Sequence, residues 1–466
     1  MTTVSVPGGG GTFQNLNFNT VDNTAFQNAW LNSLAATFAN PNIFTSTDPS
    51  TPSTNPGQLS FFVIPQNAST PTPFTVANGF NGVVDLAIGS NTINGNSGTN
   101  ESIVSASGDL TFNAGAGEAG TFAAAGGNNV FIAPSVGGGN WTMLFDSNGI
   151  GEQNTITAGS GNDMILDTAG ENNVIHLGAG SDTLGASGND TVYAGTGQDT
   201  VFLNGSSDNN TVLNGSSGTL TAVDNGGVNT VIGGAGPETI FANVGGGTYL
   251  GGTSANASMV FVNNVTVSGG AASTFTAGSG NSTVFATAGN GVYNTGKGPF
   301  TMLAENGVDT VNVGAGMNTV LAFAGANGDV SLTGGGVGNI LVATGGNATL
   351  NASNSTGANV MFNDAGAGNS ATLMGGSYYN FFVGGTANAT MAGAAGFNFF
   401  QFTNGASGGN DTITGWTNND QIDLYGYGAS QPSETTAGGS TVITLSDNTK
   451  ITVSGVSNLA SKYIHL

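Results

Sequence analysis

The stretch GAGSDTLGASGNDTVYAGTGQDTVF, residues 178–202, decides the fold because it repeats one short phrase three times. Each copy has a glycine-rich segment followed by an acidic residue, a threonine and an apolar residue. The phrase polar-Thr-Val/Ile recurs along residues 91–413. Glycines favour turns, β-branched residues favour strands, and the intervals are too short for βαβ units. The pattern predicts an all-β protein, a parallel β-roll or β-helix solenoid.

The repetition also has an energetic reason. One short repeat cannot bury its own apolar face, whereas stacked copies bury a continuous one. We therefore expect the β-branched residue of each copy to point inward. The alternative is a glycine-rich disordered linker, which would not need a regular apolar phase.

Three segments of the chain differ in composition and in hydrophobic pattern. Near the N-terminus, apolar residues recur at helical spacing and a proline follows them, which predicts one amphipathic helix over about 23–39. The apolar residues of this helix are Phe26, Trp30, Leu31, Leu34 and Phe38. The predicted divisions are an N-terminal module with this helix and extended segments at 1–80, a β-solenoid at 81–405 with its best repeats at 155–204, and a β-rich C-terminal cap at 406–466.

The charge balance restricts the partners. The 466 residues include 26 acidic residues, three lysines and no arginine, for a formal charge of -23. Nucleic acids are held by Lys and Arg, so nucleic-acid binding is not expected, and cations are the natural partners. The absence of cysteine excludes disulfides and thiolate metal sites. No apolar run approaches the roughly 18 residues typical of a membrane span.

Residues 159–165, 178–184 and 195–201 resemble the RTX, or haemolysin-type calcium-binding, nonapeptide Gly-Gly-x-Gly-x-Asp-x-apolar-x. The glycines allow sharp turns that present carbonyl groups, the aspartate supplies charge, and calcium prefers six to eight oxygen ligands. The resemblance implies Ca²⁺ held between successive turns, although the aspartates could instead be solvated turn residues. The metal-site candidates are Gly159, Gly161, Asp163, Gly178, Gly180, Asp182, Gly188, Asp190, Gly195, Gly197 and Asp199.

If each nonapeptide forms half a turn, the aspartates separate onto two faces. Asp163, Asp182 and Asp199 share the face with complete motifs, whereas Asp190 lies on the other face. Its partners there are Asn172 and, as an open alternative, Asp208. Later copies keep the frame but replace the aspartate by Glu238, Ser282 and Asn318. We therefore expect a solenoid that continues with few or no ions.

The C-terminal segment 406–466 resembles the C-terminal region of RTX proteins exported by type I secretion. The matching elements are NDTITGW at 410–416, DQIDLYGYG at 420–428 and STVITLSDNTKITVSGV at 440–456. In that family the export signal is C-terminal and is not cleaved. The N-terminal segment lacks the basic stretch and apolar core of a signal peptide. The resemblance implies a secreted, extracellular protein at the cell surface.

The catalytic patterns are weak, so we expect no enzyme. The only histidines are His176 and His465, and there is no HExxH motif. Residues 405–409 match GxSxG without a strand-elbow-helix context, and 291–298 lacks the Ser or Thr of a phosphate-binding loop. Paired carboxylates of a glycosidase remain an open alternative.

Low charge, missing cysteine, calcium-type repeats and the C-terminal segment together resemble RTX-type bacterial surface-layer proteins. The leading hypothesis is a calcium-stabilised structural protein that self-assembles into a surface layer, extracellular filament or biofilm matrix. Its partners would be further copies of itself, with cell-surface polysaccharide as a further candidate. The alternative is a monomeric adhesin or carbohydrate-binding β-helix protein. The aromatic tracts 378–385 and 397–402 either fill the core or form an intersubunit contact.

Overall fold

The computed structural model divides into two compact units, Met1–Glu238 and Thr239–Leu466. Both units are built almost entirely of β-strands, and parallel strands stack turn upon turn as a β-solenoid. The prediction of an all-β solenoid is confirmed. The structure describes residues 2–8, 12–18, 24–68, 73–146, 152–168, 172–205, 208–215, 217–242, 248–250, 258–263, 273–276, 282–288, 291–294, 300–304, 308–313, 318–322, 328–334, 339–343, 347–428, 432–459 and 463–464.

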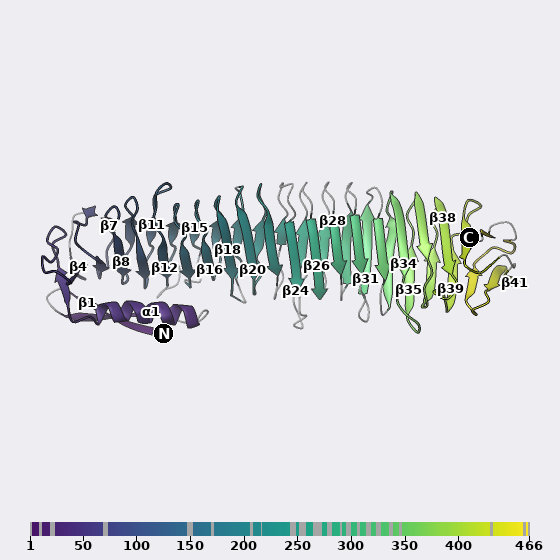
Figure 1. Ribbon diagram of the computed structural model, residues 1–466, viewed down its shortest axis with the longest axis horizontal. Helices are drawn as coiled ribbons and strands as arrows, with labels where there is room; N and C mark the ends of the chain where they lie inside the picture. The colour runs from purple at the N-terminus through teal and green to yellow at the C-terminus, as the bar shows by residue number, and fades with distance from the viewer. Residues whose placement is uncertain are drawn as a thin grey trace. The chain divides into compact units, whose positions relative to one another are not determined.

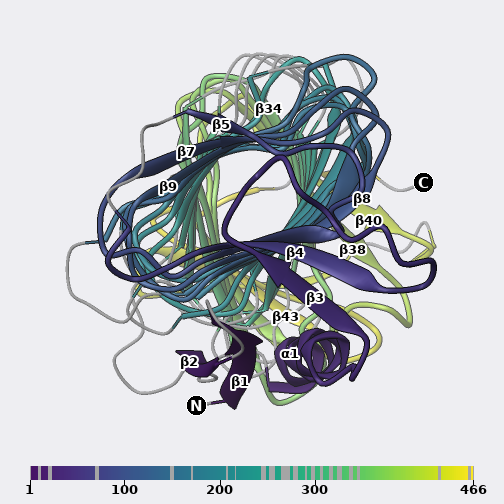
Figure 2. The same cartoon turned by 90° about the vertical axis from the view of Figure 1, so that its left-hand side faces the viewer.

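In the first unit two parallel sheets face each other across the core, with β4 and β8 on one side and β5, β7 and β9 on the other (Figure 2). Sheet 1 contains β3 (Ile43–Ser46), β4 (Leu59–Ile64), β6 (Gly82–Asp85), β8 (Asn100–Ser105), β10 (Ala119–Ala124), β12 (Trp141–Phe145), β14 (Met164–Asp167), β16 (Thr183–Ala186), β18 (Gln198–Leu203) and β20 (Thr219–Asp224). Sheet 2 contains β5 (Phe74–Thr75), β7 (Asn91–Asn94), β9 (Leu110–Asn113), β11 (Val130–Ile132), β13 (Thr155–Thr157), β15 (Val174–His176), β17 (Thr191–Tyr193), β19 (Thr211–Leu213) and β21 (Thr230–Ile232).

The apolar residue of the complete repeats points inward, as the repeat predicts. Leu184 pairs with Val201 in sheet 1, and Ile175 pairs with Val192 in sheet 2. These four side chains are fully buried. Because side chains alternate along a strand, the neighbouring threonines face outward. The core is therefore a stack of aliphatic side chains between the two sheets.

Helix α1 (Thr24–Phe38) lies along the outer face of sheet 1 in the first unit (Figure 1). Its Leu31, Leu34 and Phe38 are buried against outward-facing residues of sheet 1, namely Val63, Val84, Val104, Leu144 and Leu166. The Phe38 ring is 5.1 Å from that of Phe61. The helix predicted over about 23–39 is present, and it covers apolar rows that would otherwise face solvent. Next to it, β1 (Thr2–Pro7) and β2 (Phe13–Phe18) form an antiparallel hairpin.

Sheet 1 begins at Ile43, within the segment 1–80 that the sequence assigns to an N-terminal module. Ile43 pairs with Leu59 in parallel, and Phe61 pairs with Gly82. The extended segments of the N-terminal region therefore join the first unit. The boundaries proposed at residues 80 and 405 stay predictions.

The second unit repeats the architecture with longer strands. Its sheet 1 strands are β22 (Glu238–Ala242), which begins at the unit boundary, β24 (Ser258–Asn263), β26 (Ser282–Ala288), β28 (Phe300–Ala304), β30 (Asn318–Ala322), β32 (Asn339–Ala343), β34 (Ala358–Asn363), β36 (Tyr379–Val383), β38 (Phe397–Thr403), β40 (Gln421–Tyr425) and β44 (Tyr463–Ile464). Its sheet 2 strands are β23 (Thr248–Leu250), β25 (Ser273–Thr276), β27 (Gly291–Asn294), β29 (Val308–Val313), β31 (Gly328–Gly334), β33 (Ala348–Asn354), β35 (Ser370–Met374), β37 (Asn388–Ala392), β39 (Asn410–Thr414), β41 (Ser433–Ala437), β42 (Ser440–Thr444) and β43 (Lys450–Val453). Strands β41, β42 and β43 are joined antiparallel, which ends the parallel stacking of sheet 2.

Two glycines at one corner of the first unit are required for different reasons. Gly178 has a φ of 86°, a left-handed conformation that a side chain disfavours. Gly180 has an ordinary φ, but a Cβ there would overlap the carbonyl oxygen of Gly161 on the preceding turn. Glycine at 180 therefore allows two turns to approach closely.

Gly180→Ala is expected to lower the free energy of unfolding by about 2 to 3 kcal/mol, because backbone atoms must shift to admit the methyl group. Gly215→Ala is the matched control, since a Cβ at Gly215 meets nothing within 4 Å. Chemical denaturation of both variants measures the difference. Equal loss of stability in the two variants would contradict the close-approach explanation.

Candidate metal centre

Three predicted acidic residues line up along one edge of sheet 1 in the first unit. Asp182 Oδ1 accepts a hydrogen bond from the Asp163 backbone N–H at 2.7 Å, and Asp199 Oδ1 accepts one from the Asp182 N–H at 3.3 Å. Asp163 Oδ1 accepts one from the Trp141 N–H at 2.6 Å. The three aspartates are at most 2% exposed. We call this set, Asp163, Asp182 and Asp199, the acid ladder; each carboxyl group caps the backbone of the preceding turn.

The second oxygen of two ladder carboxyl groups has no hydrogen-bond partner. Oδ2 of Asp163 and Oδ2 of Asp182 are buried and accept no hydrogen bond, whereas Oδ2 of Asp199 accepts one from Gly195 N–H at 2.7 Å. Burial raises the pKa of Asp163 to about 7, and burial followed by the charges of its two ladder neighbours raises that of Asp182 to about 7. A buried carboxylate without a partner is costly. A proton or a cation at these oxygens would remove that cost.

The glycines of the motif mainly support the close stacking of turns. Gly159 O accepts a hydrogen bond from Ala179 N–H at 2.7 Å, and Gly178 O accepts one from Thr196 N–H at 2.8 Å. A Cβ on Gly197 would overlap the carbonyl oxygen of Gly180. One turn earlier, a Cβ on Gly180 would overlap the carbonyl oxygen of Gly161 in the same way. The carbonyl group of the first glycine in these motifs therefore already accepts a backbone hydrogen bond from the next turn.

Calcium could be held here only by a mixed set of ligands. It takes six to eight oxygens, which include backbone carbonyls and water as well as carboxylates. Among the described residues no group of three or more His, Cys, Asp or Glu side chains gathers at one point. The ladder would contribute Oδ2 of Asp163 and Oδ2 of Asp182, and backbone carbonyls or water would supply the remaining ligands. The donor types fit calcium, and the acidic side chains alone do not complete the coordination.

The structure places Asp190 on a second ladder, at one edge of sheet 2. Asp190 Oδ1 accepts a hydrogen bond from the Asn173 N–H at 2.9 Å, and Asn210 Oδ1 accepts one from the Asp190 N–H at 2.8 Å. Asn172, which the repeat frame assigns to this face, directly precedes Asn173, and Asp208 lies close enough for its charge to raise the pKa of Asp190. The corner hydrogen bonds themselves are made by Asn173 and Asn210, 17 and 20 residues away from Asp190.

Asparagines form most of this second ladder, which we call the amide ladder. It contains Asn129, Asn154, Asn173, Asp190, Asn210 and Asn229, and each side-chain oxygen accepts a backbone N–H from the preceding turn. Burial, and then the charge of Asp167, raises the pKa of Asp190 to about 9. Asp190 is therefore mostly protonated at neutral pH, and its Oδ2 has no hydrogen-bond partner, like Oδ2 of Asp163 and Asp182. Gly188, with a φ of 128°, forms the turn before it.

Repeats that have lost the aspartate of the motif form hydrogen bonds at the corners with other polar side chains. Glu238 Oε1 accepts hydrogen bonds from Gly234 N–H at 2.7 Å and from Asn214 Nδ2 at 2.9 Å. In the second unit Asn359, Asn380 and Asn398 bond to one another through their amides, at 2.9 and 2.8 Å. The predicted glycines of the later frames, at 278, 280, 314 and 316, lie outside the described residues. Polar ladders therefore occur where the RTX-like motif has faded.

A buried pair of glutamates in the first unit has no motif that identifies it in the sequence. Glu101 and Glu118 in the first unit are at most 1% exposed, and Oε2 of Glu101 and Oε1 of Glu118 accept no hydrogen bond. Burial, together with the charge of Glu101, raises the pKa of Glu118 to about 9. The only indication of this pair in the sequence is that Glu118 lies within GAGEAG, a glycine-rich segment that does not match the RTX motif.

The catalytic candidates are in structural positions. His176 is the last residue of β15, and its ring stacks on that of Tyr193 at 4.5 Å and 6°. Ser407 Oγ accepts a hydrogen bond from Thr403 N–H at 2.8 Å and donates one to Gly384 O at 3.3 Å. His465 and Lys297 lie outside the described residues. The expectation that the chain is not an enzyme stays a prediction.

Comparisons with known proteins give no family for the chain. No protein-family model matches it, and no curated protein matches it either. In the part of the chain that the structure describes, no helix is long and apolar enough to cross a membrane.

The pKa values of the ladder predict a pH dependence for the calcium-free protein. The pKa of Asp163 and Asp182 is about 7 in the folded state, against 3.8 for an ordinary aspartate. The folded state therefore keeps protons that the unfolded state releases, so this contribution is complete below about pH 4 and is lost as pH rises through 7. Urea denaturation in EGTA should show a falling free energy of unfolding over this range. A rise over the same range would contradict the raised pKa values.

Asp182→Asn separates the hydrogen-bonding role from the charge. Asparagine keeps an oxygen for the Asp163 N–H, as in the amide ladder, and removes a buried carboxylate. We expect the calcium-free variant at pH 7.5 to melt at or above the wild-type temperature, and to lose most of the stabilisation by calcium. Asp364→Asn, at an exposed acid of the second unit, is the charge-matched control and should keep it. Equal calcium stabilisation in the Asp182 variant would exclude the acid ladder as the site.

Proposed function

We propose that the chain is a secreted structural protein that calcium stabilises and that assembles into a surface layer, extracellular filament or biofilm matrix. The observation that carries this proposal is the acid ladder with its buried, unpartnered Oδ2 atoms on adjacent turns, Asp163 and Asp182. The ladder stabilises a stack of turns and lies in no substrate pocket among the described grooves. A stack of this kind suits a structural role.

Calcium would couple folding to arrival outside the cell. Before export little free calcium is present, so protons would have to neutralise the buried ladder. Outside, sites with dissociation constants of about 0.1 to 1 mM would fill, and the binding free energy would add to folding. The resemblance of residues 406–466 to a type I secretion region supports this route.

Self-assembly is supported by the charge distribution and by the open architecture. Solenoids have terminal turns whose strands lack a neighbour, and such edges promote association unless they are covered. Charged residues make only 6% of the chain, so much of its surface lacks the charges that keep other proteins apart. These features favour contacts between copies.

Electron microscopy of the purified full chain, with 5 mM calcium and with EGTA, tests this function. We expect ordered sheets or fibres in calcium and dispersed particles in EGTA. The Asp182→Asn variant should resemble the EGTA sample, and Asp364→Asn should resemble the wild type. Dispersed monomers in calcium that bind insoluble polysaccharide would favour the adhesin instead. Identical images in calcium and EGTA would contradict the calcium dependence.

A further inference from the structure

The two aromatic tracts of the second unit lie side by side in sheet 1. Tyr379 pairs with Phe397 and Phe381 pairs with Phe399, on strands β36 and β38. Between them, Phe382 and Phe400 are fully buried and stack at 4.9 Å inside the core. Because side chains alternate along a strand, the tracts fill the core with one set of rings and present the other set outward.

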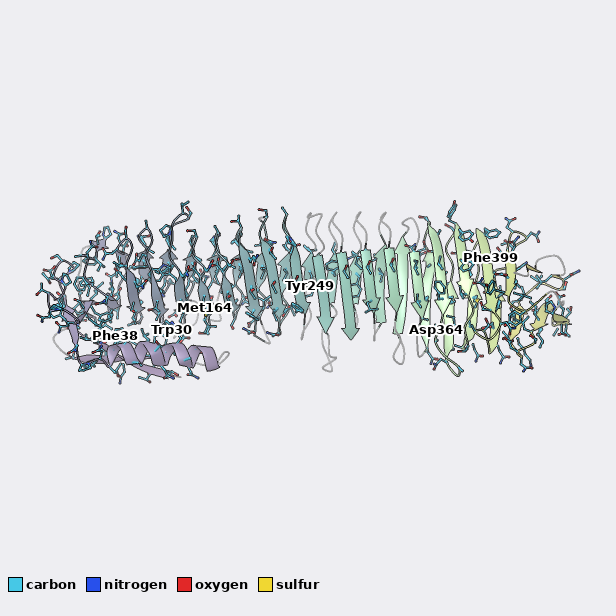
Figure 3. All side chains as sticks on the ribbon, in the orientation of Figure 1. Trp30, Phe38, Met164, Tyr249, Asp364 and Phe399 are labelled. Carbon is cyan, nitrogen blue, oxygen red and sulfur yellow. The ribbon has the colours of Figure 1, made fainter. Side chains whose placement is uncertain are left out.

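The outward set forms a continuous apolar surface. We call it the aromatic face, and it consists of Val360, Phe362, Tyr379, Phe381, Phe397 and Phe399 on β34, β36 and β38. All six side chains are partly exposed, and Ile340 on the adjoining β32 is 38% exposed. Figure 3 shows Phe399 on this part of the sheet and the exposed Asp364 at its margin.

Charges are excluded from the aromatic face. The acid nearest to it along the sheet is Asp423 of β40, which is buried and accepts a hydrogen bond from Gln401 Nε2 at 2.8 Å. Asp364 follows the end of β34 in a loop. An apolar surface without charge on a chain of formal charge -23 is a distinct feature and marks an interaction site.

We propose that the aromatic face is a self-association surface, on which a second copy of this chain docks its own aromatic face, sheet against sheet. The contact is isologous, so each residue of the face meets the same set on the other copy. Two sheets can pack face to face at about 10 Å with interleaved side chains, as in a β-sandwich. The inference rests on the proposed assembly and names one contact within it.

The orientation of the rings favours a protein partner over a sugar. Tyr379 and Phe397 stack at 5.5 Å and 9°, and Phe381 and Phe399 stack at 5.2 Å and 13°. Rings stacked along the sheet cover each other's flat faces and direct their edges outward. A sugar binds to the flat face of an aromatic ring, whereas ring edges insert between the side chains of an apolar surface. The geometry therefore fits another apolar sheet.

Charge favours a second copy of the same chain as the partner. Two copies with a charge of -23 each repel unless they meet through an uncharged surface, and this face provides one. A basic partner would instead be attracted to the acidic parts of the surface. The self-complementary pattern of ring edges and aliphatic side chains needs no other protein.

The first unit shows how the same type of surface is closed within the chain. There the outward rows of sheet 1, with Val84, Val104 and Leu144, are buried under α1. In the second unit, the main neighbours of β36 among the described strands are β34 and β38 of the same sheet. Sheet 1 therefore carries outward apolar rows in both units, and the chain supplies a helix for one of them.

The size of the face sets the expected affinity. The three strands of the face, about 4.8 Å apart and about five residues long at about 3.3 Å per residue, cover about 240 Å² per copy. Two copies thus bury on the order of 480 Å², well below the about 1,200 Å² of most stable interfaces. The isolated contact is therefore a weak dimer, which repetition in an array would strengthen through multivalency.

Sedimentation velocity of the calcium-loaded full chain over a range of concentrations tests the contact. Wild type should show a reversible dimer whose population rises with salt, because salt screens the repulsion between copies. The double variant Phe381→Thr/Phe399→Thr should weaken dimerisation at least about tenfold, since aromatic anchors dominate such interfaces. Threonine keeps strand propensity, and circular dichroism checks the fold.

The matched control removes exposed apolar side chains elsewhere. Ile132 and Val228 in the first unit are 41% and 54% exposed, and Ile132→Ser/Val228→Ser should dimerise like wild type. If the first double variant fails to fold, Tyr379→Thr/Phe397→Thr tests the same face. A monomeric wild type at all concentrations, or unchanged dimerisation of the folded variants, would overturn the proposal. Loss of polysaccharide binding by the variants without any wild-type dimer would also overturn it.

This outcome can be separated from that of the proposed function. Ordered assemblies that persist in the Phe381→Thr/Phe399→Thr variant would refute the aromatic face and leave the structural role intact. A dimer that depends on the face, without sheets or fibres in calcium, would refute the structural role and leave the contact intact.

Discussion

Side-chain oxygens at the solenoid corners accept hydrogen bonds from the backbone of the preceding turn, and the stacking of the turns depends on this contact. The strands are short, so a corner must satisfy backbone N–H groups that no sheet partner reaches. Asp182 and Asn210 perform this function at equivalent positions of the two sheets. The apolar core then lies between corners that are already hydrogen-bonded.

The two ladders differ in the second polar atom of the side chain, which is a nitrogen in asparagine and an oxygen in aspartate. An amide group presents a donor there, which can find an acceptor, as Asn173 Nδ2 does with Asp167 Oδ2 at 2.7 Å. A carboxylate presents another acceptor, which in Asp163 and Asp182 has no donor. The acid ladder and Asp190 are thus the parts of the corner system whose stability depends on protons or cations, while the asparagines of the amide ladder carry no charge to neutralise.

The outer surface follows from the same strand alternation as the core. Longer apolar stretches, such as FNFFQF at 397–402, place large side chains on both faces of a sheet. In the first unit α1 covers the resulting outward rows, and in the second unit the side chains of the aromatic face are partly exposed. Alternate residues of the aromatic tracts therefore fill the core and face outward, and the contact between copies stays a proposal.

Local pattern was sufficient to predict the solenoid, the inward phase of Val201 and Val192, and the helix near 24–38, because strand alternation and helical spacing are properties of short segments. The register was not predictable in the same way. Hydrogen-bonded partners on successive turns are separated by 17 to 25 residues, and in the weaker copy the motif frame marks Asn172, whereas the corner hydrogen bond involves Asn173. Only the tertiary structure decided which acidic oxygens lack donors and which outward rows a helix covers. Those properties depend on contacts between residues far apart in the chain, and the lengths of all intervening turns determine them.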